Sequence, residues 1–182
     1  NDLMHAALIT SKNAYSRIKK IDFSKLKTLS FQTHFFSAKD IPGKNDIGPI
    51  FGDEPIFAEK IISYFGQPIA VVIADNYQKA MYAAKLIEIK TERIGEPILN
   101  LKQALKKKSF LISPFELKKG NAKLEIEKAK NVLSGNFSIG GQDHFYLESQ
   151  ISMAIPSEND EMTIWSSTQH PSEVQHGVGN VL

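Results

Sequence analysis

The chain has 182 residues, of which 42% are hydrophobic and 23% charged, so it is long enough to bury a core as one large or two small domains. A net charge of +2 is too small for a nucleic-acid-binding surface, and the lack of cysteine excludes disulfides, iron–sulfur clusters and thiolate zinc sites within this chain. No apolar run reaches the ~20 residues of a membrane span and no signal peptide is visible, so we expect a cytoplasmic protein without membrane contact.

The clearest predicted unit is a strand followed by a helix. Residues 69–74 form a continuous apolar run, which is typical of a strand buried on both faces. Asp75 is the predicted helix N-cap, with Gln78 in the capping-box position. The apolar stripe of this helix is predicted at positions spaced i, i+3, i+4 and i+7, namely Tyr77, Ala80, Met81 and Ala84.

A second strand follows this helix. Apolar and charged residues alternate over residues 87–92, which predicts a strand with one face in water. A strand, a helix and a strand in succession favour a right-handed crossover with the two strands parallel in one sheet. Strands near Met4–Ile9 and Phe31–Ser37 are expected to join that sheet.

A long segment before this unit has no predicted regular structure. Residues 40–55 hold three prolines and three glycines in sixteen residues. A loop of this length within a compact domain is either disordered or functional. Its apolar residues Ile47, Ile50 and Phe51 argue against disorder, because they need something to bury against.

A polar stretch rich in Lys and Glu, at about residues 114–130, separates the two halves of the chain. Beyond it, strands are predicted at Val132–Ile139, Phe145–Ile155 and Met162–Ser167. After Pro171 a helix is expected to present Val174, Val178 and Val181 on one face. Three strands and one unpartnered helix do not complete a domain, so we expect the chain to be cut from a longer protein.

Two polar stretches of the second half are candidate site segments. Residues 140–150 place hydrogen-bonding groups among apolar strand positions, which indicates either a β-bulge with a satisfied polar network or part of a site. Residues 166–171 end a strand and open a helix, a common place for ligand contacts. The histidines lack the i, i+4 spacing of a helical metal site and no Gly-x-Ser-x-Gly elbow is present, so zinc and serine catalysis are not predicted.

Four stretches of the sequence, in this order and spacing, together resemble the xanthine dehydrogenase/aldehyde oxidase family of molybdenum hydroxylases. They are Asp40–Glu54, Gly66–Ala74, Gly140–Glu148 and Ser166–Pro171. The resemblance covers essentially the whole chain. Within the family, the loop with Asn45, Gly48 and Asp53-Glu54 is most similar to the molybdenum-binding subunit of bacterial xanthine dehydrogenases.

The resemblance implies an α+β fold in three parts. These are an α/β-hammerhead domain over residues 1–112, a linker over residues 113–130 and the truncated start of the first molybdopterin-binding domain over residues 131–182. The family's glycine-rich stretch over the cofactor, its substrate-orienting arginine and its two active-site glutamates find no match in this sequence and are expected beyond Leu182. The isolated chain is therefore expected to be inactive and to bind no cofactor.

The resemblance also implies the activity of the complete enzyme, the hydroxylation of hypoxanthine and xanthine to urate with oxygen from water. Molybdenum–molybdopterin would belong to the complete subunit. Iron–sulfur clusters and FAD are expected on other chains, because this one has no cysteine. The expected partners are the remainder of the molybdenum subunit, a subunit that carries FAD and iron–sulfur clusters, and the purine substrate.

Few site residues transfer from the family to this sequence. Gln169 matches the glutamine that donates a hydrogen bond to an oxo ligand of the molybdenum, a role that suits a neutral amide. Ile50 and Phe51 match residues that line the substrate funnel. Support of the pocket is assigned to Gly140, Gly141 and Gln142. No catalytic residue and no metal ligand is expected within this segment.

Two alternatives remain open from the sequence. One is a related molybdenum hydroxylase that acts on an aldehyde or on another N-heterocycle. The other is a non-catalytic, free-standing hammerhead module. A Gly-Gly-Phe-Gly segment soon after Leu182 would favour the enzyme, and a stop codon there would favour the module.

Overall fold

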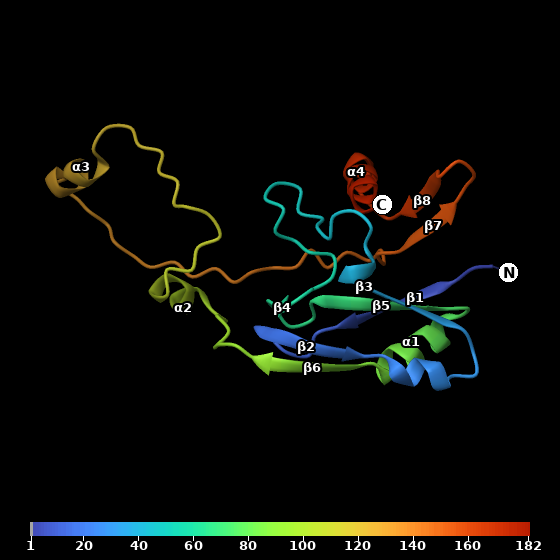
Figure 1. Ribbon diagram of the computed structural model, residues 1–182. Helices are drawn as coiled ribbons and strands as arrows, with labels where there is room; N and C mark the ends of the chain where they lie inside the picture. The colour runs from blue at the N-terminus through green and yellow to red at the C-terminus, as the bar shows by residue number, and fades with distance from the viewer. Residues whose placement is uncertain (1) are drawn as a thin grey trace. The chain divides into compact units, whose positions relative to one another are not determined.

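The computed structural model describes residues 2–182, and the chain divides into two compact units. Unit 1 takes in the residues up to Pro97 together with Thr168–Leu182, and unit 2 is Ile98–Ser167. Strands and short helices occur in both units (Figure 1). None of the helices in the described part of the chain is long and apolar enough to cross a membrane.

Unit 1 is built on two antiparallel sheets of three strands each (Figure 1). The first sheet has the order β1–β5–β3, formed by His5–Thr10, Pro68–Ala74 and Thr33–Ser37. The second has the order β4–β2–β6, formed by Ile61–Ile62, Ser16–Asp22 and Glu88–Arg93. Two short 3-10 helices, η1 and η2, span Ser24–Thr28 and Ala38–Asp40.

Strand β5 lies at the centre of the unit 1 core. Ala70 and Val72 are fully buried against α1 (Tyr77–Leu86) and its surroundings, and Ile69 is fully buried in a cluster with β4. The predicted apolar strand is therefore confirmed. Burial on both faces was expected, but Val71 and Ile73 are half-buried, so one face of the strand is closed more completely than the other.

The N-cap of α1 differs by one residue from the prediction. The side chain of Asn76 accepts a hydrogen bond from the backbone N–H of Lys79, with a distance of 2.9 Å between Oδ1 and N. Asp75 instead forms an exposed ion pair with the Nζ of Lys79 at 2.6 Å. Asp75 and Asn76 are both good capping residues, so local sequence preference did not separate them.

The buried stripe of α1 is also shifted from the predicted one. Ala80 and Ala83 are fully buried and Ala84 is half-buried, whereas Tyr77 and Met81 are exposed. Small side chains on the inner face let the helix axis approach the sheet closely. The larger apolar residues, which suggested the stripe, lie toward solvent instead.

The predicted parallel crossover is wrong. β5 and β6 lie in different sheets, and every strand pair in unit 1 is antiparallel. Both edges of β5 are occupied by β1 and β3, so β6 pairs with β2. The expectation that segments near Met4–Ile9 and Phe31–Ser37 would join the sheet of β5 is confirmed by β1 and β3.

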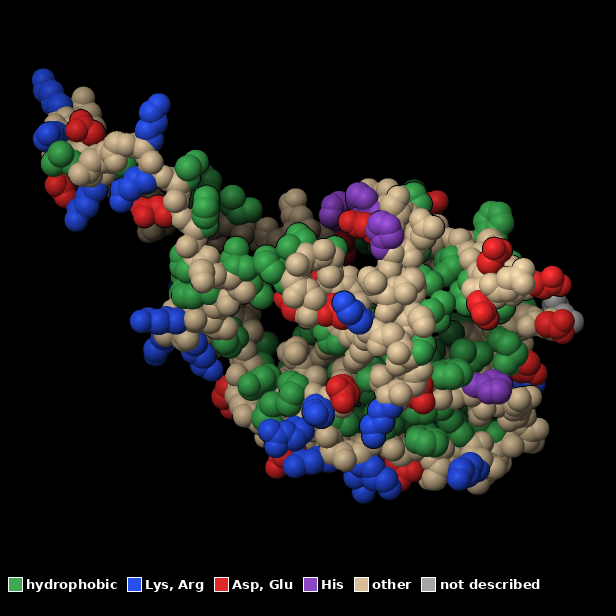
Figure 2. Space-filling model, turned by 45° about the horizontal axis from the view of Figure 1, so that its top comes forward, with side chains coloured by type: hydrophobic (Ala, Val, Ile, Leu, Met, Phe, Trp, Pro, Cys, Tyr) green, Lys and Arg blue, Asp and Glu red, His purple; other side chains and the backbone are tan. Residues whose placement is uncertain are grey.

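Unit 2 has little regular structure and none of its residues is buried. Its elements are α2 (Leu101–Lys106), α3 (Ala122–Lys128), β7 (Ser152–Pro156) and β8 (Met162–Ser166). The strand expected at Val132–Ile139 does not form, and the one expected at Phe145–Ile155 is reduced to β7. Figure 2 shows hydrophobic side chains, in green, at many places on the visible surface. An extended segment without a partner strand forms no ladder hydrogen bonds and leaves its backbone groups to water, and among the described residues β7 and β8 pair only with each other.

Helix α4 (Pro171–Val181) belongs to unit 1 by its contacts. Pro171 occupies the first turn, as predicted, where its missing N–H costs no hydrogen bond. The predicted face of Val174, Val178 and Val181 is confirmed, because these three side chains are half-buried.

Candidate functional site

The predicted substrate-funnel residues lie on a loop that is closed at its base by one side chain. We call residues 43–57 the apolar-tip loop. Asn45 Nδ2 donates to the carbonyl oxygen of Phe57 at 2.7 Å, and Asn45 Oδ1 accepts from the N–H of Phe57 at 2.9 Å. Phe57 and the following Ala58 are buried. This reciprocal amide pair therefore fastens the start of the loop to the core of unit 1.

A second polar side chain organises the interior of the apolar-tip loop. Asp46 Oδ1 accepts from the N–H of Gly48 at 2.7 Å and, at 3.4 Å, from that of Glu54. The N–H of Ile47 donates to the carbonyl of Glu54 at 2.9 Å, which joins the two sides of the loop. Gly52 has a positive φ of 61°, a conformation that favours glycine, and it faces Asp46. The loop is thus ordered without any helix or strand.

The tip of this loop presents apolar side chains to the surface. Ile50 is 79% exposed and Phe51 is 68% exposed. The expectation that these residues and Ile47 would find burial is not met among the described residues, because Ile47 is exposed as well. An ordered loop with an exposed apolar tip is a surface suited to contact with another molecule or segment.

The base of the apolar-tip loop also holds α4. The N–H of Gly43 donates to the carbonyl of Val181 at 2.8 Å, and the N–H of Lys44 donates to that of Asn180 at 2.7 Å. Carbonyls in the last turn of a helix have no intrahelical partner, so the loop caps the carboxyl end of α4. A Cβ at Gly43 would overlap the Asn180 carbonyl oxygen, so glycine is required there. No pattern in the sequence predicts this contact.

Gln169 lies just before α4, on the same unit as the apolar-tip loop. Its side chain is exposed and makes no hydrogen bond within residues 2–182, so its amide is free to meet a ligand. Thr168 Oγ1 accepts from the N–H of His170 at 3.0 Å, which shapes the turn around Gln169. α4 has eleven residues, so its two ends are about 16 Å apart along the axis. The loop therefore meets the far end of the helix that Gln169 precedes.

The three predicted pocket-support residues, Gly140, Gly141 and Gln142, lie in unit 2 on exposed, irregular backbone. Nothing lies within 4 Å of a Cβ built on either glycine, so no steric requirement for glycine exists there in this chain. No strand passes through them, and the β-bulge alternative is therefore wrong for this structure. Their role in supporting a pocket stays a prediction.

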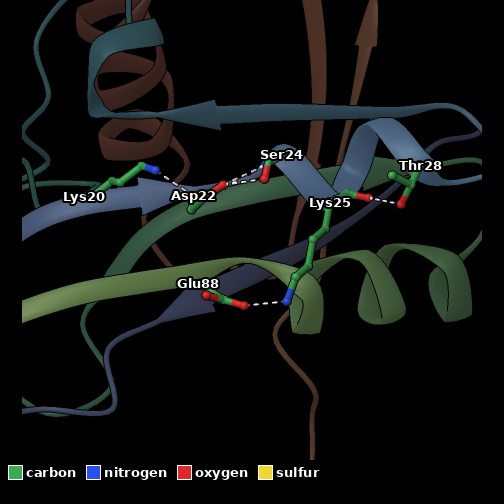
Figure 3. Close-up of polar contacts among 6 residues, drawn as sticks. All are labelled: Lys20, Asp22, Ser24, Lys25, Thr28 and Glu88. Carbon is green, nitrogen blue, oxygen red and sulfur yellow. Dashed lines mark hydrogen bonds and ion pairs between the residues drawn. The ribbon is translucent and has the colours of Figure 1, made fainter.

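A polar network on the surface of unit 1 joins β2, η1 and β6 (Figure 3). Asp22 pairs with Lys20 Nζ at 2.8 Å and accepts from Ser24 Oγ at 2.6 Å. These hydrogen bonds, the one from Lys20 first, hold the pKa of the Asp22 carboxyl well below its usual value. The hydrogen bond from Lys25 likewise lowers the pKa of Glu88. The four charged groups of the network, Lys20, Asp22, Lys25 and Glu88, lie at the surface, so we interpret the network as part of the fold and not as a reaction site.

Two hollows of unit 1 have none of the predicted site residues in their lining. One of about 580 Å³ opens beside β1 and β6, and its lining includes Leu8, Met81 and Lys85. Another of about 680 Å³ lies over β3 and η1. Neither is lined by Ile50, Phe51 or Gln169. Among the described residues, no three His, Asp or Glu side chains gather as metal ligands.

Two family models match the sequence. Residues 1–94 match the α/β-hammerhead domain of aldehyde oxidase and xanthine dehydrogenase, and residues 104–182 match a molybdopterin cofactor-binding domain. The expected α+β fold of a hammerhead domain followed by the start of a molybdopterin-binding domain is confirmed. The predicted linker at residues 113–130 stays a prediction.

The curated relatives include several xanthine dehydrogenases. The chain is 37% identical over 179 residues to "Xanthine dehydrogenase" of Dictyostelium discoideum, and 36% identical over 180 residues to "Xanthine dehydrogenase/oxidase" of Gallus gallus. Each match covers 98% of this chain but 13% of the relative. The chain therefore spans about an eighth of the length of these proteins.

Solved structures support the fold. The aldehyde oxidoreductase of Desulfovibrio gigas matches over 97% of this chain and 22% of its own, with a TM-score of 0.80 and 24% identity. Quinoline 2-oxidoreductase of Pseudomonas putida 86 matches over 98% of this chain and 25% of its own, with a TM-score of 0.79 and 21% identity. At these identities the likeness concerns the fold alone.

Proposed function

The chain belongs to the aldehyde oxidase and xanthine dehydrogenase family, and we propose that it forms the amino-terminal part of the molybdenum-binding portion of a xanthine dehydrogenase. The proposed activity is the hydroxylation of hypoxanthine and xanthine to urate with oxygen from water. The observation that carries the proposal is an identity of 36–37% to xanthine dehydrogenases over 98% of the chain. The relatives that act on an aldehyde or on quinoline are less than 25% identical, so they do not favour those substrates.

The exposed residues before α4 fit a bound molybdenum–molybdopterin group. Gln169 offers an uncharged amide donor whose hydrogen-bonding groups are unoccupied within the described chain. When bound, the cofactor would supply the redox centre that accepts electrons from the substrate. Gln169 would donate to an oxygen ligand of the metal and hold its orientation without adding charge.

The other predicted residues act on the substrate side. Ile50 and Phe51 would line the funnel through which a flat, apolar-faced ring approaches, and their exposure on an ordered loop supports this role. Gly140, Gly141 and Gln142 would support the pocket once unit 2 is packed within the complete subunit. No residue of this segment is proposed as the catalytic acid or base.

The complete enzyme would need further parts for electron transfer. With no cysteine in this chain, iron–sulfur clusters must be held elsewhere, and we propose that a separate chain carries them together with FAD. The remainder of the molybdenum-binding portion would supply the other contacts to the cofactor. Placement of the enzyme in the cytoplasm stays a prediction.

Gln169 provides the test of this function. In the complete enzyme, Gln169→Ala should slow reduction of the enzyme by xanthine about 5- to 150-fold, or ~1–3 kcal/mol, because one preorganised donor is lost while the metal carries most of the charge. Gln169→Glu should be slower still, because an ionised carboxylate can accept but not donate. Stopped-flow reduction, normalised to bound molybdenum, measures the effect.

The matched control is Gln175→Ala, which removes an exposed amide from α4 itself and should leave the rate unchanged. Parent rates in both Gln169 variants would mean that this residue only shapes the turn before α4. A parent enzyme that oxidises an aldehyde but not xanthine would contradict the proposed substrate.

A further inference from the structure

The apolar-tip loop reverses the usual placement of polar and apolar side chains. Its polar residues Asn45 and Asp46 are half-buried beneath it, whereas Ile50 and Phe51 are exposed at its tip. Surface loops normally expose polar groups, so a half-buried polar pair under an exposed apolar tip needs an explanation. The explanation lies in the backbone groups of the loop to which the two polar side chains bond.

The Asn45 contact requires an amide. One side chain both donates to Phe57 and accepts from it, at 2.7 Å and 2.9 Å. A carboxylate at this position would retain the acceptor and lose the donor. Because Phe57 is buried, the contact fixes the base of the loop to the core of unit 1 rather than to another loop.

The Asp46 contact requires an acceptor only. Its Oδ1 atom receives the N–H groups of Gly48 and Glu54, which lie on opposite sides of the tip. An asparagine retains an oxygen at the same place and preserves this arrangement, whereas an alanine does not. At position 46, asparagine is therefore a conservative substitution and alanine a disruptive one.

We infer that Asn45 and Asp46 are positioning residues, which set the orientation of Ile50 and Phe51 toward the substrate ring. This inference rests on the proposed function, since it takes the tip to face a purine. A tip that packs on the ring in both the ground state and the transition state contributes uniform binding. Its loss should therefore raise KM and leave kcat unchanged.

Steady-state kinetics of the complete enzyme with xanthine tests the inference. Asn45→Ala and Asp46→Ala should each raise KM about 10-fold, while kcat and molybdenum content stay within about twofold of the parent. Asp46→Asn should restore KM to about the parent value. A loss of kcat in proportion to molybdenum content, with KM unchanged, would show that the rest of the enzyme buries this loop and would overturn the inference.

A double-mutant cycle with Phe51→Ala separates positioning from general weakening of the fold. If Asn45 acts through the tip, Asn45→Ala should raise KM less in the Phe51→Ala background than in the parent, because only Ile50 remains to be oriented. Equal effects of Asn45→Ala in the parent and in the Phe51→Ala background would overturn the inference.

Different experimental results would contradict the proposed function and this inference. A parent enzyme that is not reduced by xanthine contradicts the function itself. A parent that turns over xanthine, together with an Asn45→Ala variant of parent KM, contradicts the inference alone.

Discussion

Units 1 and 2 both contain many apolar residues, but only unit 1 buries some of them. In unit 1, Val72 is completely buried against α1, and Ile62 and Ile69 are completely buried in a cluster between strands of the two sheets. In unit 2, Leu133 and Leu147 are as exposed as in an extended chain, and no residue of the unit is buried. Apolar content is therefore not sufficient for a core, because each apolar face also needs an element positioned to cover it.

The difference lies in the partners available to each strand. β5 finds antiparallel neighbours on both edges within unit 1. The segment 132–139, which the sequence also predicts as a strand, has none and stays irregular. Segments outside these 182 residues are the proposed partners, because the curated relatives are about eight times longer than the chain.

The largest effect expected from this comparison is on the core of unit 1. Ile69→Ala should destabilise the chain by about 2–5 kcal/mol, because it leaves a cavity where the side chain is fully buried. Leu133→Ala should change the stability of the same chain by less than about 0.5 kcal/mol, because that side chain touches little. Urea unfolding followed by far-ultraviolet circular dichroism measures both.

The same two substitutions should behave differently in the complete enzyme. There Leu133→Ala should become destabilising by about 2–5 kcal/mol if the rest of the protein covers unit 2. A Leu133→Ala variant that is neutral in both contexts would contradict the proposal that unit 2 is completed by further segments.

The next effect concerns the assignment of α4 to unit 1. Gly43→Ala should cost about 1–3 kcal/mol, because its Cβ would overlap the Asn180 carbonyl and force the loop and helix apart. Gly177→Ala on α4 meets nothing within 4 Å and should stabilise the helix by about 0.5–1 kcal/mol. Hydrogen exchange of the α4 amides should rise in the first variant and fall in the second. Exchange of the α4 amides at the parent rate in Gly43→Ala would separate α4 from the loop of unit 1.

A smaller effect distinguishes the two capping residues before α1. Asn76→Ala should cost about 0.5–2 kcal/mol, because the N–H of Lys79 loses its acceptor. Asp75→Ala should cost no more than about 0.5 kcal/mol, because it removes an exposed ion pair. Thermal unfolding of the two variants decides between the cap seen in the structure and the one expected from the sequence. The reverse order would restore Asp75 as the cap.

Local patterns predicted the elements that carry a clear local signal, such as an apolar run, a concentration of proline and glycine, or a proline that can begin a helix. The apolar run of β5, the loop after residue 40 and the start of α4 at Pro171 are all present. Strand β2 was missed because its sequence, Ser16–Asp22, is rich in charged residues and shows no clear apolar face. Because β2, the central strand of the second sheet, was not predicted, no second sheet was expected and β6 was assigned to the sheet of β5.

The roles of the candidate site residues stay predictions, but the structure shows where these residues lie. The resemblance pointed to Gln169, Ile50 and Phe51, and the structure places all three on unit 1. It did not point to Asn45 and Asp46 as the residues that hold the loop. Side chains that bond to nearby backbone are common for Asn and Asp in loops rich in glycine, and that tendency was the available signal.

The smallest effect expected is electrostatic and belongs to the surface of unit 1. Hydrogen bonds from Lys20 and Ser24 lower the pKa of Asp22, so its carboxylate stabilises the folded state at pH values above its unfolded pKa of ~3.9. That contribution is lost as pH falls through the lower pKa of the folded state. Asp22→Asn should therefore be less stable than the parent at pH 7 and nearly equal to it in strong acid.

Chemical unfolding of the parent and Asp22→Asn chains from pH 7 to pH 2 tests this dependence. Ser24→Ala should lie between them, because it removes one hydrogen bond to Asp22 and leaves the pair with Lys20 (Figure 3). Added salt should reduce the difference at pH 7, because the pair is exposed and open to screening. A difference in stability between the parent and Asp22→Asn that stays constant across the whole pH range would assign the effect to packing and not to the charge of the carboxylate. It would also mean that the surface charges of unit 1 do not contribute to the difference between units 1 and 2.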